Sequence, residues 1–125
     1  TGYYTINHIS NEMIDNAHQT SAKYPEGKSE FEACGFTEEY SNNFYAPFVK
    51  ESTIKYGMKL IEIIPIKQNN TFFVIGEVQM IFVPQEIITS DGFLEIEKAN
   101  SICSLGIDGY YKAEKIIRLP YAKVK

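Results

Sequence analysis

In two stretches between residues 53 and 83, apolar residues recur at every second position, a spacing typical of β-strands that bury one face. Thr53 to Ile66 and Thr71 to Val83 are rich in β-branched and aromatic residues, and Asn69 and Asn70 lie between them. Asparagine tolerates the left-handed backbone that a tight turn requires. The pattern therefore predicts a long β-hairpin at the centre of the fold.

Shorter patterns predict a strand and a helix near the N-terminus. Tyr3 to Ile9 alternates and is rich in β-forming residues, which favours a strand. Residues 11–20 carry apolar residues at helical spacing, and Ser10 or Asn11 can cap the start of that helix.

Two more helical segments are predicted further along the chain. Ser29 can cap a single turn, Glu30 to Cys34, which stops at Gly35 because glycine accepts the left-handed conformation that ends a helix. Residues 95–104 have the spacing of a helix that docks on the sheet. We expect a mainly β fold, an antiparallel barrel-like sheet with peripheral helices, in a single domain over residues 1–125.

Gly76 interrupts the second strand of the hairpin. Glycine weakens the interior of a strand and usually marks a bulge or the close approach of another backbone or a ligand. A bulge that helps to close the barrel and a contact with a bound cofactor are both open interpretations.

Composition and charge exclude several function classes. The chain has 125 residues, 44% of them hydrophobic, with a net charge of −4 and a pI near 5.2. Nucleic-acid binding needs clustered Lys and Arg, whereas the basic residues here are scattered. No apolar run reaches the roughly 18 residues that span a bilayer. We expect neither a nucleic acid nor a membrane as a partner.

The cysteines and histidines do not form a recognisable metal-binding pattern. Cys34 and Cys103 are far apart, and His8 and His18 belong to different predicted elements, so the spacing indicates neither a zinc site nor a disulfide framework. Two buried thiols in a reducing, cytoplasmic setting are the simplest interpretation. A catalytic Cys-His pair depends on geometry and stays open.

The segment around Asp108 is the first candidate site. Gly106 and Gly109 flank this residue and allow a tight return of the chain, while an extended backbone places Tyr110 and Tyr111 on opposite faces. One interpretation is an ordinary turn leading into an edge strand. In the other, a tyrosine ring stacks on a flat heterocycle, and a hydroxyl or carboxylate hydrogen-bonds its edge.

The end of the first helix is the second candidate. Thr20 and Ser21 can touch the polar edge of a ligand, or they can satisfy the backbone groups of the last helical turn. His18 is a weaker candidate for a proton donor, because no partner carboxylate can be identified in the sequence.

Several short segments along the chain occur in an order that is typical of one protein family. No single segment is specific for that family, but the ordered set is. The segments are Thr1 to Asn7, His18 to Pro25, Ser29 to Glu32, Gly35 to Thr37, Gly76 to Val78, Asp91-Gly92, Gly106 to Tyr111 and Arg118 to Ala122. Their order resembles the flavin reductase-like, FMN-binding split-barrel family, in which a T-G-x-F-x-x-N strand precedes a G-E-V strand, a D-G turn and a Gly-rich return bearing tyrosine.

The resemblance implies an FMN-binding oxidoreductase in which NAD(P)H delivers a hydride to flavin N5, and it implies a homodimer with flavin held between subunits. It places cofactor binding at two segments, whose candidate residues are Thr20, Ser21, Gly106, Asp108, Tyr110 and Tyr111. It assigns no catalytic residue and no metal.

Members of that family have several strands before the T-G-x-F strand, and these carry a phosphate-binding Ser/Thr motif and a Lys-Asp-Thr motif. Because the chain starts at Thr1, we expect it to be the C-terminal portion of a longer split-barrel domain, with little flavin activity alone. Missing strands would leave unpaired edges and apolar surface, which predicts self-association. The alternative class is a non-catalytic β-barrel module for interaction or dimerisation.

Overall fold

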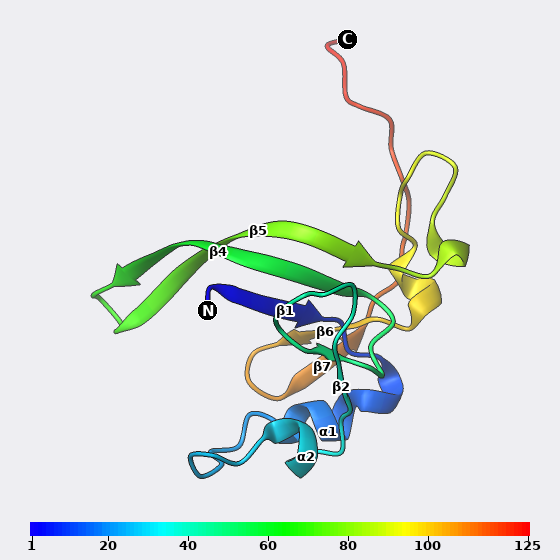
Figure 1. The fold of residues 1–125 in the computed structure, drawn as a ribbon. Helices are drawn as coiled ribbons and strands as arrows, with labels where there is room; N and C mark the ends of the chain where they lie inside the picture. Colours follow the sequence, from blue (N-terminus) through cyan, green and yellow to red (C-terminus); the bar gives the residue numbers. More distant parts are fainter.

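The computed structural model describes residues 1–125 and is mainly β (Figure 1). In chain order its elements are β1 (Tyr3–Asn7), the 3-10 helix η1 (Asn11–Met13), α1 (Ile14–Gln19), α2 (Glu30–Ala33), β2 (Glu38–Glu39), β3 (Phe48–Val49), β4 (Lys55–Ile66), β5 (Thr71–Phe82), the 3-10 helices η2 (Gln85–Ile87) and η3 (Ile96–Ala99), β6 (Ile102–Leu105) and β7 (Gly109–Lys112). The mainly β fold class predicted from the sequence is confirmed.

The long β4–β5 hairpin is the centre of the structure, as the alternating pattern predicts. It forms a three-stranded antiparallel sheet in the order β1-β4-β5, so the outer edge of β5 has no neighbouring strand. Asn70 adopts a φ of +55° in the connecting turn, whereas Asn69 does not adopt a positive φ. The β2–β3 and β6–β7 pairs form two smaller sheets.

Gly76 lies opposite a bulge and beneath a tyrosine. The register passes from Leu60 opposite Gly76 to Glu62 opposite Ile75, so Ile61 is an extra residue on β4. A Cβ atom at Gly76 would overlap with the hydroxyl of Tyr4 from β1. A bulge is therefore present at this point of the hairpin, but it lies on the strand opposite Gly76. The group that approaches Gly76 closely is a side chain of the same sheet.

The core lies at the base of the hairpin. Phe48 and Ile54 are fully buried, and a cluster of Phe44, Ala46 and Phe48 packs against Met80 and Phe82. Toward the hairpin tip, apolar side chains are largely exposed. Only 12 of 125 residues are buried, which means that much of the apolar surface of the sheet has no covering layer within this chain.

The predicted helix over residues 95–104 is wrong in its second half. The helical turn η3 ends at Asn100, whose φ of +53° terminates it, and residues 102–105 form β6. The backbone of β6 pairs with β7 along its full length, from Ile102 opposite Lys112 to Leu105 opposite Gly109. The strand pairing thus overrides the helical spacing, which is a weak preference over so short a segment.

The helices near the N-terminus lie close to their predicted boundaries, but the predicted capping hydrogen bonds are absent. η1 and α1 together cover Asn11–Gln19, and Gly35, just after α2, has a φ of +74°. Ser10 and Ser29 take the N-cap positions without a capping hydrogen bond from their side chains. The Ser10 hydroxyl donates instead to the Glu12 carboxylate at 2.8 Å.

The two cysteines are free and differ in exposure. Cys34 is buried, with its Sγ 3.4 Å from the Tyr24 hydroxyl. Cys103 is exposed, so the prediction of two buried thiols is wrong for this residue, because residues 102–105 form a strand of a small sheet and not a docked helix. None of the helices combines the length and the apolar character that crossing a bilayer would require.

Candidate functional site

Helix α1 and the β6–β7 hairpin meet through a histidine and a tyrosine. The Tyr110 hydroxyl lies 2.8 Å from Nδ1 of His18, a hydrogen-bonding distance between residues that are 92 positions apart. The two rings meet edge to face, with centroids 5.7 Å apart. The contact brings the two candidate segments of the sequence together at one place, below the sheet in Figure 1.

The local backbone conformation of each segment directs its side chains toward the contact between His18 and Tyr110. On α1, Ile14, Asp15 and His18 follow one another at the i, i+1, i+4 spacing that puts them on one helical face. At the β6–β7 turn, Gly106 adopts a φ of +71°, a conformation that side chains other than glycine rarely take. This tight turn presents Asp108 beside Tyr110.

A cavity of about 440 Å³ lies between these elements. Its lining residues are Ile14, Asp15, His18, Gln19, Asp108 and Tyr110. The amide, imidazole and hydroxyl groups can donate to carbonyl oxygens, and the carboxylates can accept from ring N–H groups. No Lys or Arg lines the cavity, so this donor set suits the polar edge of a neutral heterocycle and not a phosphate.

A second polar cluster fixes the β6–β7 hairpin to the main sheet. His8 lies between the Tyr56 hydroxyl, 2.8 Å from Nε2, and the buried Ser101 hydroxyl, 3.2 Å from Nδ1. Next to it, the N–H of Ile102 donates to the carbonyl of Ile9 at 3.1 Å. Partial burial lowers the pKa of His8 below its ordinary value, because desolvation disfavours the imidazolium.

The comparisons with known proteins agree with this architecture. Residues 1–93 match the family model described as flavin reductase like domain. The chain belongs to the flavin reductase-like family.

Three individual proteins show the similarity in more detail. A candidate flavin reductase with a split barrel domain from Shewanella frigidimarina is 47% identical, with a TM-score of 0.94 over 98% of this chain and 62% of its own. An uncharacterised protein of Aquifex aeolicus is 30% identical over 113 residues, which are 90% of this chain and 57% of the relative. Flavoredoxin of Desulfovibrio vulgaris (Miyazaki F), 23% identical with a TM-score of 0.77 over 96% of this chain and 63% of its own, shares the fold. This flavin reductase-like chain thus spans about three-fifths of the length of these relatives.

The structure separates the sequence-predicted site residues of this family member into two groups. Asp108 and Tyr110 line the cavity, and Gly106 shapes the turn that carries them. The hydroxyls of Thr20 and Ser21 instead donate to the carbonyls of Ala17 and His18, both at 2.7 Å. These two side chains satisfy the last turn of α1, as the capping interpretation predicts.

Tyr111 points away from the cavity. Tyr111 is 54% exposed, and its backbone carbonyl oxygen lies 3.6 Å from the Cys103 sulfur. The partly buried Tyr110 lies on the opposite face, as expected for neighbours on a strand. The hydrogen-bonding partners of the two thiols are Tyr24 and Tyr111, so neither cysteine is paired with a histidine.

Sequence reasoning missed three lining residues and the partner of His18. Ile14, Asp15 and Gln19 line the cavity without having been candidates. The helical spacing of residues 14, 15, 18 and 19 was the available signal, since positions four apart share a face. The partner of His18 is a tyrosine from the far end of the chain, which no local pattern indicates.

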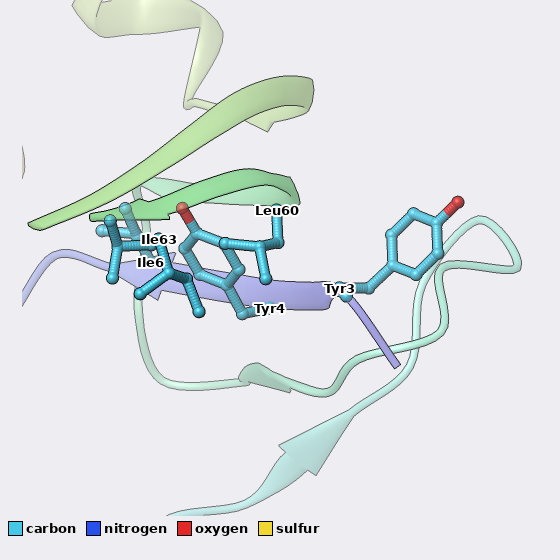
Figure 2. Close-up of a pocket in the computed structure, with 7 residues that line it drawn as sticks. Tyr3, Tyr4, Ile6, Leu60 and Ile63 are labelled. Carbon is cyan, nitrogen blue, oxygen red and sulfur yellow. The ribbon is translucent and has the colours of Figure 1, made fainter. Parts of the chain in front are cut away.

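A larger concave surface, of about 580 Å³, lies on the three-stranded sheet (Figure 2). It is lined by Gly2, Tyr3, Tyr4, Ile6, Leu60, Ile63 and Val74. Figure 2 shows Tyr4 beside Leu60, Ile6 and Ile63, with the Tyr3 ring pointing away from them. Six of its seven lining residues are hydrophobic, so this surface offers few groups that could orient a reacting molecule, and we regard it as a packing surface.

Proposed function

We propose that this chain is part of an FMN-binding oxidoreductase that transfers a hydride between NAD(P)H and flavin. The family match over residues 1–93 is the observation that carries the proposal. The cavity between α1 and the β6–β7 turn supports it, because the polar groups there suit the edge of a flavin or nicotinamide ring.

Each polar residue that lines the cavity has a defined task in this proposal. Tyr110 offers a hydroxyl and a ring face, and His18 orients that hydroxyl through their 2.8 Å hydrogen bond. Asp108 and Asp15 can accept hydrogen bonds from ring N–H groups, and Gln19 can donate to a carbonyl oxygen. When bound, the flavin supplies the hydride chemistry, while these side chains hold and orient the ring edge.

We propose that residues 1–125 form the C-terminal portion of one split-barrel domain and that the phosphate of FMN is held elsewhere in that domain. The absence of Lys and Arg from the cavity lining supports this division. We therefore expect the 125-residue chain to bind FMN weakly by itself. The free cysteines are compatible with a reducing, cytoplasmic setting, which is part of the proposal.

Flavin fluorescence tests the proposal directly. FMN is titrated into the 125-residue chain and into a longer form of the protein that carries the upstream strands. Anaerobic reduction by NADH or NADPH is then followed from the flavin absorbance. We expect tight binding and reduction with the longer form alone. A longer form that is indifferent to FMN would remove the assignment, and tight binding by the 125-residue chain would show that the phosphate site is misplaced.

The exposed hairpin favours a second candidate function, a non-catalytic module for interaction or dimerisation. Phe72 and Phe73 on β5 are 66% and 57% exposed, and the outer edge of β5 is unpaired. Apolar edges of this kind commonly pair with another chain. We propose self-association as a homodimer under either function, and flavin binding by the longer form distinguishes the two.

A further inference from the structure

The β6–β7 hairpin, which carries Asp108 and Tyr110 of the cavity, is joined to the elements on both sides of it. Figure 1 shows this hairpin between the three-stranded sheet and α1. On the side of α1, the contact is the hydrogen bond between Tyr110 and His18. On the side of the sheet, Ser101 and Ile102 contact the residues that follow β1. The relative position of the two cavity walls therefore depends on this second junction.

His8 supplies the side chain of that junction. Its Nδ1 lies 3.2 Å from the Ser101 hydroxyl, and its Nε2 lies 2.8 Å from the hydroxyl of Tyr56 on β4. The backbone of His8 belongs to the main sheet, because its N–H donates to the carbonyl of Ile54 at 2.9 Å. The imidazole thus connects the start of the hairpin to the sheet.

Ser101 depends on His8 for its hydrogen bond. The residue is 3% exposed, and His8 is the partner of its hydroxyl. A buried hydroxyl that loses its partner pays the cost of its desolvation, so positions of the hairpin that break this bond are disfavoured. The N–H of Ile102 donates to the carbonyl of Ile9 at 3.1 Å and adds a backbone bond at the same point.

Both walls of the cavity begin near His8. Along the chain, η1 and α1 follow it and carry His18, and the buried Met13 packs this connection against the body. Across space, Ser101 leads into β6, whose backbone pairs with β7 along its full length. A paired hairpin transmits a displacement as a unit, so a shift at Ser101 would move Tyr110 relative to His18.

We propose that His8 is a positioning residue of the candidate site. Its bond to Ser101 sets where the β6–β7 hairpin lies and so holds Tyr110 and Asp108 opposite α1. His8 does not line the cavity, so it acts through the hairpin and not on a bound molecule. The expected effect on flavin rests on the proposed function, whereas the expected effect on the contact between His18 and Tyr110 does not.

Two buried serines provide a matched pair of variants. Ser101 and Ser52 are both 3% exposed, and both contact His8. The Ser52 hydroxyl donates to the backbone carbonyl of His8 at 2.7 Å, on the side of the main sheet. Ser101→Ala removes the link to the hairpin, and Ser52→Ala removes a hydroxyl of equal burial that does not contact the hairpin. The melting temperatures of both variants separate a general loss of stability from a loss of positioning.

NMR of the imidazole nitrogens in the FMN-free longer form of the protein tests the proposal without any flavin. The signal of His18 is assigned as the one that His18→Gln removes. We expect Ser101→Ala to move this signal toward its position in Tyr110→Phe, and Ser52→Ala to leave it in place. An unchanged His18 signal in Ser101→Ala, or an equal shift in both serine variants, would overturn the positioning role.

Two replacements of His8 provide a test that does not depend on Ser101→Ala being folded. The amide of asparagine reaches the place of Nδ1, beside Ser101, whereas the amide of glutamine reaches the place of Nε2, beside Tyr56, and both amides donate and accept. We expect the His18 signal of the parent to be retained in His8→Asn and shifted in His8→Gln. A shift of equal size in both, or in neither, would contradict the proposal.

Titration with FMN connects the positioning role to the proposed function. We expect the dissociation constant of the longer form to rise roughly two- to tenfold in Ser101→Ala, the effect of one lost hydrogen bond, and to stay unchanged in Ser52→Ala. A parent that does not bind FMN, together with the expected His18 shifts, would remove the function and leave the positioning role. Tight FMN binding without those shifts would remove the positioning role alone.

Discussion

The Tyr110 hydroxyl lies 2.8 Å from Nδ1 of His18 and so joins β7 to α1 across the candidate site. Each side chain comes from a segment with a local reason for its conformation, a helical turn for His18 and a glycine-bearing hairpin for Tyr110. Both side chains line the cavity, and their hydrogen bond fixes the position of the Tyr110 hydroxyl there. This hydroxyl is the group that we propose to contact the flavin.

Tyr110→Phe, made in the longer form of the protein, is expected to weaken flavin affinity several-fold. The change removes the hydroxyl and leaves the ring, and one neutral hydrogen bond contributes about 1 kcal/mol. Fluorescence titration with FMN measures the loss. Tyr111→Phe is the matched control, since that residue is 54% exposed and faces away from the cavity. Equal effects from both variants would argue against the assigned site.

Asp108→Ala is expected to slow reduction of the flavin or weaken its binding without lowering the melting temperature. Asp108 lines the cavity and is in none of the salt bridges, so we expect its removal to change stability little. Stopped-flow reduction by NAD(P)H and thermal unfolding are measured on the same sample. A large drop in melting temperature with unchanged flavin kinetics would assign the residue a structural role.

Gly76→Ala is expected to destabilise the fold by roughly 1–3 kcal/mol, because the new methyl group would overlap with the Tyr4 hydroxyl. Tyr4→Phe removes that oxygen and should recover part of the loss when the two changes are combined. Urea unfolding of the single and double variants gives the coupling free energy. If the effects simply add, the overlap is relieved by movement of the strands and the two residues are not coupled.

Stability is expected to rise with pH between the lowered pKa of His8 and its ordinary value of 6.5. In this window the unfolded chain binds more protons at His8 than the folded chain does, so protonation favours unfolding. As the pH falls through this window, the stabilising effect is lost. Chemical denaturation at a series of pH values measures the slope. His8→Gln should reduce the slope.

The ionic contacts that residues 113–125 make with the rest of the chain are expected to be visible in acid titration. Hydrogen bonds from Lys115 and then Lys98 lower the pKa of Glu95 from 4.5 to about 2. This contribution is present above pH 4.5 and is lost as the pH falls toward the lowered value. In an NMR titration of carboxyl carbons, Lys115→Met should raise the Glu95 pKa further than Lys98→Met does. Equal pKa values in parent and variant would show that Lys115 is not bound there.

The sequence alone determined the elements whose signals are local. Alternation over 12-residue strands specifies the β4–β5 hairpin because every second side chain must face the same side of a sheet. Asn70 and Gly35 were recognisable because few residue types accept a positive φ. The ordered set of short motifs indicated the family, since it samples the whole chain and does not depend on any one residue.

Tertiary structure decided what depends on partners distant in sequence. Residues 102–105 became a strand because β7 supplied a backbone ladder that outweighs a short helical preference. Gly76 is required by a tyrosine from β1, and His18 gains its role from a tyrosine 92 positions away. Such contacts depend on how the chain closes in space, and a sequence pattern reports only on neighbours along the chain, so the cavity could be assembled from the structure alone.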